Sequence, residues 1–174
     1  MKHGHRLLVG GLVVVALAAV LALLLVSGKG ALAAPDIIYV DADATGANSG
    51  TSWDDAFPAL QQALDAALLG DQIWVAAGTY KPTTEHGGTG SRFKSFQLKN
   101  GVALYGGFDP DMGDVAWGHR DWVSNPTILS GDRGIGEAGL DDSYHVFYHP
   151  AGTVDGNAIL DGFDQHLMVK QAGQ

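Results

Sequence analysis

After Gly70, the chain reads as a series of short apolar runs, each closed by Gly, Asp or Pro. The runs are QIWVAAG, VALYGGF, PTILSGD, YHVFYHP and NAILDGF, with Ile73, Val102, Ile128, Val146 and Ile159 as markers. Their β-branched and aromatic content predicts strands. The stretches between them are rich in Gly, Asn, Asp, Thr and Ser and show no helical periodicity of useful length. This pattern argues against a fold in which strands alternate with helices.

The stretch GDQIWVAAGTYKPT, residues 70–83, offers neither a two-residue turn nor an alternating return strand, so it does not predict a hairpin. Parallel strands need a crossover connection. Further short strands and turns supply one when the chain winds into a coil, and each strand then pairs with the coils before and after it. Such a parallel β-helix needs several repeats and capped ends. An antiparallel β-sandwich accounts for turn-bounded strands equally well, and spacing alone leaves both open.

One amphipathic helix is expected over residues 55–69. Its apolar stripe consists of Phe57, Leu60, Leu64, Ala67 and Leu68. Asp54 or Asp55 is expected to cap the N-terminus of the helix, and Gly70 to end it. We expect this helix to bury Leu60, Leu64 and Leu68 against the first coil as an N-terminal cap.

The first 33 residues have the three-part plan of a secretory signal. Lys2 and Arg6 precede an apolar run over residues 7–26, and Ala31 and Ala33 fit a small-residue cleavage site. Cleavage after Ala33 would start the mature protein at residue 34. The apolar run is also long enough for a retained membrane anchor. Either alternative places the rest of the chain outside the cytoplasm, secreted or at the cell surface.

The mature part is strongly acidic and contains no cysteine. Residues 34–174 carry 7 Lys and Arg against 19 Asp and Glu, a formal net charge of 7 − 19 = −12. This charge disfavours nucleic acid and anionic lipid as partners. Membrane contact is expected only through residues 7–26, if they are not cleaved. An exported domain without disulfides relies on its core or on bound ions.

The mature chain resembles secreted bacterial right-handed parallel β-helix proteins of the pectin-lyase-like superfamily, in particular the polymorphic outer-membrane-protein group. The matching pieces are YVDADATGANSGTSW, ALQQALDAALLGDQIWVAAGTY, SFQLKNGVALYGGF, RDWVSNPTILSGD and NAILDGF, in this order over residues 37–163. The resemblance implies an all-β fold: the N-terminal part of a right-handed parallel β-helix over residues 34–163, with one amphipathic capping helix, preceded by a signal or anchor helix.

Family members continue through more coils, whereas this chain ends in an atypical tail, residues 164–174, with the sequence DQHLMVKQAGQ. The departure predicts a truncated or frameshifted product. The superfamily includes lyases, hydrolases and adhesins, so the fold does not determine the function. We expect an exported scaffold, adhesive or polysaccharide-contacting, with polysaccharide or the cell envelope as partner. A polysaccharide lyase or hydrolase whose catalytic coils are missing from this chain is the alternative.

Two groups of polar residues are candidate metal sites. His145 and His149 lie on an expected strand, where residues four apart are about 13 Å apart at ~3.3 Å per residue. One metal ion cannot bridge that gap. The loop 41–50 begins like a calcium loop with Asp41 and Asp43, but the position of the bidentate Glu is taken by Ser52. No metal ligand and no cofactor are therefore predicted, and calcium in this loop is kept as an alternative.

Clustered acids are the candidates for a catalytic site, and aromatic residues are the candidates for sugar binding. The segment GDRGIGEAGLDD holds Asp132, Arg133, Asp141 and Asp142, but it lacks the Gly-His-Gly and Arg-x-Lys pieces of polygalacturonases, so no catalytic residue is assigned. The aromatic residues are Trp53, Trp74, Tyr80, Tyr105, Phe108, Trp117 and Trp122. Trp74 is expected to be buried. Trp117 and Trp122 lie in polar loop sequence and are the better candidates for stacking on sugar rings.

Overall fold

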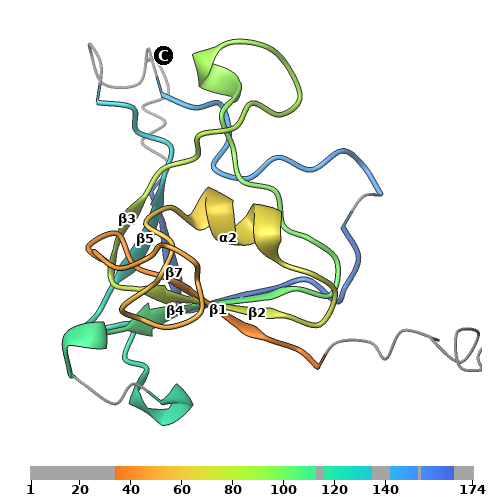
Figure 1. The fold of residues 1–174 in the computed structure, drawn as a ribbon. Helices are drawn as coiled ribbons and strands as arrows, with labels where there is room; N and C mark the ends of the chain where they lie inside the picture. Colours follow the sequence, from red (N-terminus) through yellow and green to blue (C-terminus); the bar gives the residue numbers. More distant parts are fainter. Residues whose placement is uncertain (1–33, 113–115, 135–141, 153, 167–174) are drawn as a thin grey trace, which may run out of the picture. The chain divides into compact units, whose positions relative to one another are not determined.

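Seven short strands and one α-helix form the fold of the described residues, which are 34–112, 116–134, 142–152 and 154–166 of a computed structural model (Figure 1). The four-stranded sheet, sheet A, has the order β1-β2-β4-β6, and the three-stranded sheet, sheet B, has the order β3-β5-β7. Sheet A comprises β1 (Ile37–Val40), β2 (Gln72–Ala76), β4 (Ala103–Phe108) and β6 (Ile159–Asp161). Sheet B comprises β3 (Gly78–Tyr80), β5 (Thr127–Ser130) and β7 (Phe163–His166).

All neighbouring strands within the two sheets are parallel. From β2 onwards, successive strands alternate between sheet A and sheet B. Strand β2 pairs with β1 on one side and β4 on the other, so its partners lie before and after it along the chain. The expected absence of a hairpin after residue 70 is confirmed, and the antiparallel sandwich is wrong for the described strands.

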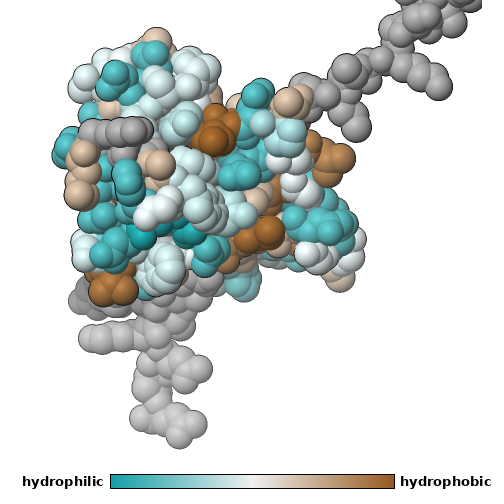
Figure 2. All heavy atoms as spheres, turned by 90° about the horizontal axis from the view of Figure 1, so that it is seen from below, coloured by the Kyte–Doolittle hydropathy of each residue, from teal (hydrophilic) through white to brown (hydrophobic). Residues whose placement is uncertain are grey.

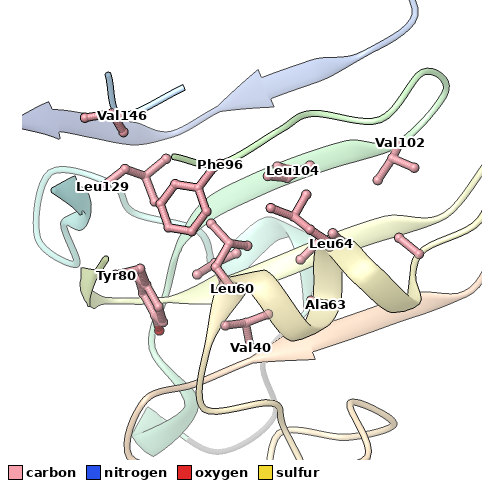
Figure 3. Close-up of a cluster of buried hydrophobic side chains, with 13 residues drawn as sticks. Val40, Leu60, Ala63, Leu64, Tyr80, Phe96, Val102, Leu104, Leu129 and Val146 are labelled. Atoms are coloured by element: carbon pink, nitrogen blue, oxygen red, sulfur yellow. The ribbon is translucent and has the colours of Figure 1, made fainter. Parts of the chain in front are cut away.

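The fold class itself differs from the expected all-β parallel β-helix. Two small parallel sheets and α2 (Leu60–Ala66) make a mixed α/β arrangement. The helix lies along sheet A and contacts β1 and β2 (Figure 1). Leu60 and Leu64 of α2 belong to the same buried cluster as Leu104 and Leu129 (Figure 3). The helix therefore shares one core with both sheets through its buried face, while Gln62, Asp65 and Ala66 on its other face are exposed.

Helix α2 is shorter than the predicted 55–69. Its N-cap is Ala59, whose methyl group cannot accept a hydrogen bond. The expected cap at Asp54 or Asp55 is therefore wrong, and Asp55 Oδ1 accepts the N–H of Ala47 at 2.7 Å. At the other end, the C-cap Ala67 is extended, and Asp71 Oδ2 accepts the N–H of Leu68 at 2.8 Å within the turn that follows the helix. Leu60 and Leu64 are buried as predicted, but Leu68 is 68% exposed. The expected three-leucine contact is therefore wrong at its last residue.

The core is continuous across the two sheets. Its inward side chains come from alternate strand positions, such as Ile73 and Leu104, since successive side chains of a strand face opposite sides. Phe96 and Val146, from two irregular segments, complete it (Figure 3). The predicted strand around Val146 is reduced to a single parallel bridge between Phe96 and Phe147.

The predicted leader, residues 1–33, lies outside the described residues, as do residues 167–174 of the predicted tail. The first residues of that tail belong to β7. Within the described part of the chain, no helix has the length and apolar character needed to cross a membrane.

Candidate functional site

An aromatic row crosses the outer face of sheet A. Tyr39 of β1, Trp74 of β2 and Tyr105 of β4 are partners in register, and Asp161 of β6 continues the row. These residues face outward because they alternate with the inward core positions of the same strands. The rings of Tyr39 and Trp74 meet edge to face with centroids 6.0 Å apart. Parallel pairing has therefore placed one aromatic residue from each of β1, β2 and β4 side by side.

The segment between β4 and β5 brings Trp117 onto this face. Trp117 begins the short 3-10 helix η3 (Trp117–His119). Its ring packs against Tyr105 at 4.4 Å between centroids and against Trp74 at 5.8 Å. Trp117 remains 46% exposed, whereas Trp74 is only 7% exposed. Trp117 is thus the exposed edge of an otherwise packed aromatic cluster.

Arg120 holds this segment against the sheet. Its guanidinium donates to the Gly106 carbonyl at 2.9 Å, to the Asp161 carbonyl at 3.2 Å and to Asp161 Oδ2 at 3.1 Å. The guanidinium carbon also lies 4.7 Å from the centre of the Trp117 ring and 5.4 Å from that of Trp122. The Arg120 side chain is only 5% exposed. Such planar, multidentate contacts suit Arg and not Lys.

A shallow hollow of about 310 Å³ opens beside Trp117. It is lined by Ile37, Gln72, Trp74, Tyr105 and Trp117. Gln72 Oε1 accepts the indole N–H of Trp74 at 3.0 Å, and this fixes the amide at the floor of the hollow. Apolar walls with a few placed polar groups are typical of small-ligand sites. We call this hollow and its five residues the Trp117 hollow.

Figure 2 views the molecule from below the orientation of Figure 1 and shows apolar residues as separate brown patches among polar ones. On this face, the described apolar residues do not merge into one broad surface.

The other predicted aromatic residues have different roles. Trp53 packs between Tyr39 and Phe108, with ring centroids 4.9 and 5.5 Å apart. Tyr80 is buried in the core and donates to the Ala76 carbonyl at 3.2 Å, and burial raises the pKa of its hydroxyl. Trp122 is 53% exposed but does not line the hollow. The predictions that Trp74 is buried and that Trp117 and Trp122 are exposed are confirmed.

The two histidines of the HVFYH segment have separate surroundings. His149 Nε2 accepts the N–H of Leu98 at 3.3 Å. Burial, and then the neighbouring His86, lower the pKa of the His149 imidazole. His145 lies beside Tyr148, with ring centroids 6.0 Å apart. Within the described residues, no group of three or more side chains could hold a metal ion.

The 41–50 loop is organised by its own hydrogen bonds. Asp41 Oδ1 accepts the N–H of Asp43 at 3.0 Å, as in an Asx-turn. The Gly46 N–H donates to the Asp54 carbonyl at 3.1 Å. Burial raises the pKa of the Asp41 carboxyl, with smaller contributions from Asp43 and Asp111. The calcium alternative for this loop stays a prediction.

The structure brings Asp132, Arg133 and Asp142 together, while Asp141 lies outside the described residues. Asp142 is buried, and its Oδ1 accepts the N–H of Arg133 at 3.4 Å. Asp132 Oδ1 accepts the N–H of Gly134 at 2.7 Å. Arg133 donates its side-chain N–H to the Ser91 carbonyl. The side chains of Asp132, Arg133 and Asp142 thus form hydrogen bonds with backbone groups. This geometry does not favour a catalytic role.

Sequence reasoning missed the importance of Arg120 and Gln72. A signal was nevertheless present, because the runs IIYV, QIWV and ALYG each carry an aromatic residue at the third position. Once parallel pairing in register is assumed, that repetition predicts the aromatic row. The contact of Arg120 with β4 and β6 depends on how the 109–126 segment folds back, which has no periodic signal.

Comparisons with protein-family models, with curated proteins and with solved structures find no match. The likeness to pectin-lyase-like proteins therefore stays an interpretation of the sequence, and function is argued from the geometry of the described residues.

Proposed function

We propose that this protein is an exported, cell-surface or secreted scaffold that contacts polysaccharide through the Trp117 hollow. The observation that carries the proposal is the 46% exposed Trp117 ring, held at the rim of an open hollow over Tyr105 and Trp74. Export rests on the leader pattern of residues 1–33, and the acidic surface makes nucleic acid an unsuitable partner.

The chemistry of the hollow suits a sugar ring. A pyranose presents one apolar face of C–H groups and a rim of hydroxyls, which matches an aromatic wall beside a fixed amide. Gln72 keeps its amide N–H groups for a ligand, since its Oε1 already accepts from Trp74. Rigid aromatic side chains also lose little conformational entropy when they bind.

Binding and turnover can be tested in one experiment. Purified protein is incubated with a panel of neutral and uronate polysaccharides, and both retention and product release are measured. We expect retention on at least one polysaccharide, with neither unsaturated products nor new reducing ends. Trp117→Ala should weaken binding about tenfold, since an aromatic contact contributes about 1 kcal/mol beyond its buried area.

Trp122→Ala is the matched control, because Trp122 has the same side chain and lies on the same segment but outside the hollow. It should bind about as well as the parent. Equal weakening by the two variants would contradict a specific role of the hollow. Turnover that is abolished by Asp132→Asn would replace the scaffold proposal with an enzymatic one.

A further inference from the structure

A second hollow, of about 150 Å³, lies at the ends of β3 and β5, on the sheet that does not carry the Trp117 hollow. It is lined by Lys81, Pro82, Lys94, Ser130, Gly131, Asp132, Arg133 and Ser143. We call it the Lys94 hollow. Three cations and one carboxylate therefore face one small space, in a mature chain whose formal net charge is −12.

The cations of the described residues divide into two groups. Arg120 forms an ion pair with Asp161. Lys99 donates to the carbonyls of Asp65 and Ala67 at the end of α2, at 3.0 and 3.1 Å. Arg92 donates to the Asp142 carbonyl at 2.9 Å. The remaining three described cations, Lys81, Lys94 and Arg133, all line the Lys94 hollow. Half of the described Lys and Arg residues therefore line one hollow. The acidic composition of the mature chain does not explain this clustering.

The positive charge of the Lys94 hollow is only partly compensated. Lys81 Nζ lies 3.9 Å from Asp132 Oδ2, and both side chains are close to half exposed, so solvent screens this pair strongly. Asp132 also accepts a backbone N–H. Lys94 is half-buried, and no carboxylate lies within ion-pair distance of its ammonium among the described residues. A half-buried cation gains from an anion, because the lower local dielectric strengthens their attraction.

We propose that the Lys94 hollow binds a small oxyanion, the carboxylate, sulfate or phosphate group of a ligand. The volume of about 150 Å³ is several times the ~30 Å³ that one water molecule occupies in the liquid, so it holds a group of a few heavy atoms. Lys94 and Arg133 supply the charge-assisted donors. The Ser130 hydroxyl, which accepts the N–H of Asp132 at 3.1 Å, keeps its own proton to donate.

The test is a titration of the ¹⁵N-labelled protein followed by NMR, with sodium sulfate, phosphate, acetate and glucuronate in separate arms. Sodium chloride at matched ionic strength is the reference. We expect saturable shifts of the amides of Lys94, Gly131, Asp132 and Ser143 with at least one oxyanion and not with chloride. A preference for sulfate and phosphate assigns a tetrahedral oxyanion, and a preference for acetate and glucuronate assigns a carboxylate.

Lys94→Gln and Arg133→Gln should each weaken binding at least tenfold. Lys99→Gln removes the same charge away from the hollow and should bind like the parent. The dispersed spectrum of each variant reports that it is folded. No saturable shift with any oxyanion, or equal weakening by all three variants, would overturn the proposal. Neither result bears on the Trp117 hollow, because the amides followed and the residues changed all lie outside its lining.

Discussion

At the scale of single residues, Arg120 connects three parts of the chain that are distant in sequence. Its hydrogen bonds join the 116–126 segment to β4 and to β6. Its guanidinium also lies near four aromatic rings, those of Tyr105, Phe108, Trp117 and Trp122. Gly162 fits here because it has no Cβ, and an added Cβ would lie 2.5 Å from Arg120 Nη2. Its φ of 76° is also a conformation that glycine adopts readily and other residues rarely do. The order of the aromatic site therefore depends on the contacts of Arg120.

We expect Arg120→Ala to lower the free energy of unfolding by about 2 kcal/mol, because the buried Gly106 carbonyl loses its donor and several rings lose a packed neighbour. Arg120→Lys should recover only part of this, since an ammonium cannot make the forked contacts. Urea unfolding measures both. Lys81→Gln is the control, as its ion pair is exposed and should contribute little. Equal stabilities of Arg120→Ala and Lys81→Gln would contradict the assigned role.

His149 makes stability depend on pH. Burial and the nearby His86 lower the pKa of its imidazole below the ordinary 6.5, so the folded state binds the proton less readily than the unfolded state does. This contribution to stability is complete above pH 6.5 and is lost as the pH falls from there through the lowered folded-state value. Protonation also prevents Nε2 from accepting the Leu98 N–H.

The free energy of unfolding should therefore decline between pH 7.5 and pH 5.5, with a smaller decline for His149→Gln. Urea unfolding at several pH values within this window measures it. The exposed His145→Gln serves as control and should keep the decline of the parent. A decline that His149→Gln leaves unchanged would assign the effect to another group.

At the scale of elements, α2 offers a matched pair of leucines. Leu64 is 1% exposed within the shared core, and Leu68, one turn later in the predicted stripe, is 68% exposed. Leu64→Ala should cost about 2–5 kcal/mol through lost burial and a cavity. Leu68→Ala should change stability by no more than about 0.5 kcal/mol. Thermal and urea unfolding compare them, and similar losses for the two variants would restore the longer predicted helix.

The strands were better predicted than the helix because their signal is local. Each apolar run that starts a strand of sheet A carries both its core residue and its outward aromatic or polar residue within a few positions. The limits of α2 instead depend on Asp55 and Asp71, whose carboxylates bind backbone N–H groups elsewhere, at Ala47, Asp36 and Leu68. Periodicity carries no information on such side-chain-to-backbone bonds, and it therefore predicts a helix that is too long at both ends.

The two hollows were predictable to different degrees. Trp117 and Trp122 stood out as aromatic residues in polar sequence, and the structure selects Trp117 through its contacts with Tyr105 and Trp74. The Lys94 hollow was not predicted, because the sequence around Asp132 and Arg133 draws attention to its acids. Lys81 reaches that place because it follows β3, which pairs in parallel with β5. Lys94 comes from the segment after the short 3-10 helix Ser91–Phe93, where it forms an antiparallel bridge with Glu85.

At the scale of the whole molecule, the described residues share one hydrophobic core between two sheets that do not pair with each other. Leu129 of sheet B lies in the same buried cluster as Ile73 and Leu104 of sheet A. Thr127 adds a polar connection, since its hydroxyl accepts the Gly107 N–H at 2.9 Å and donates to the Ala76 carbonyl at 3.1 Å. Neither sheet has a core of its own, so we expect both to unfold together.

Leu129→Ala tests this cooperativity. It removes a fully buried side chain of β5 and should lower the free energy of unfolding by about 2–5 kcal/mol. If the two sheets form one cooperative unit, tryptophan fluorescence should shift to lower urea together with far-ultraviolet circular dichroism. The four tryptophans are Trp53, Trp74, Trp117 and Trp122, and none of them lies on a strand of sheet B. Ile128→Ala, at the adjacent outward position, should move both transitions much less. If the fluorescence transition stayed in place while the dichroism moved, sheet B would unfold by itself, and the shared core would not couple the two sheets.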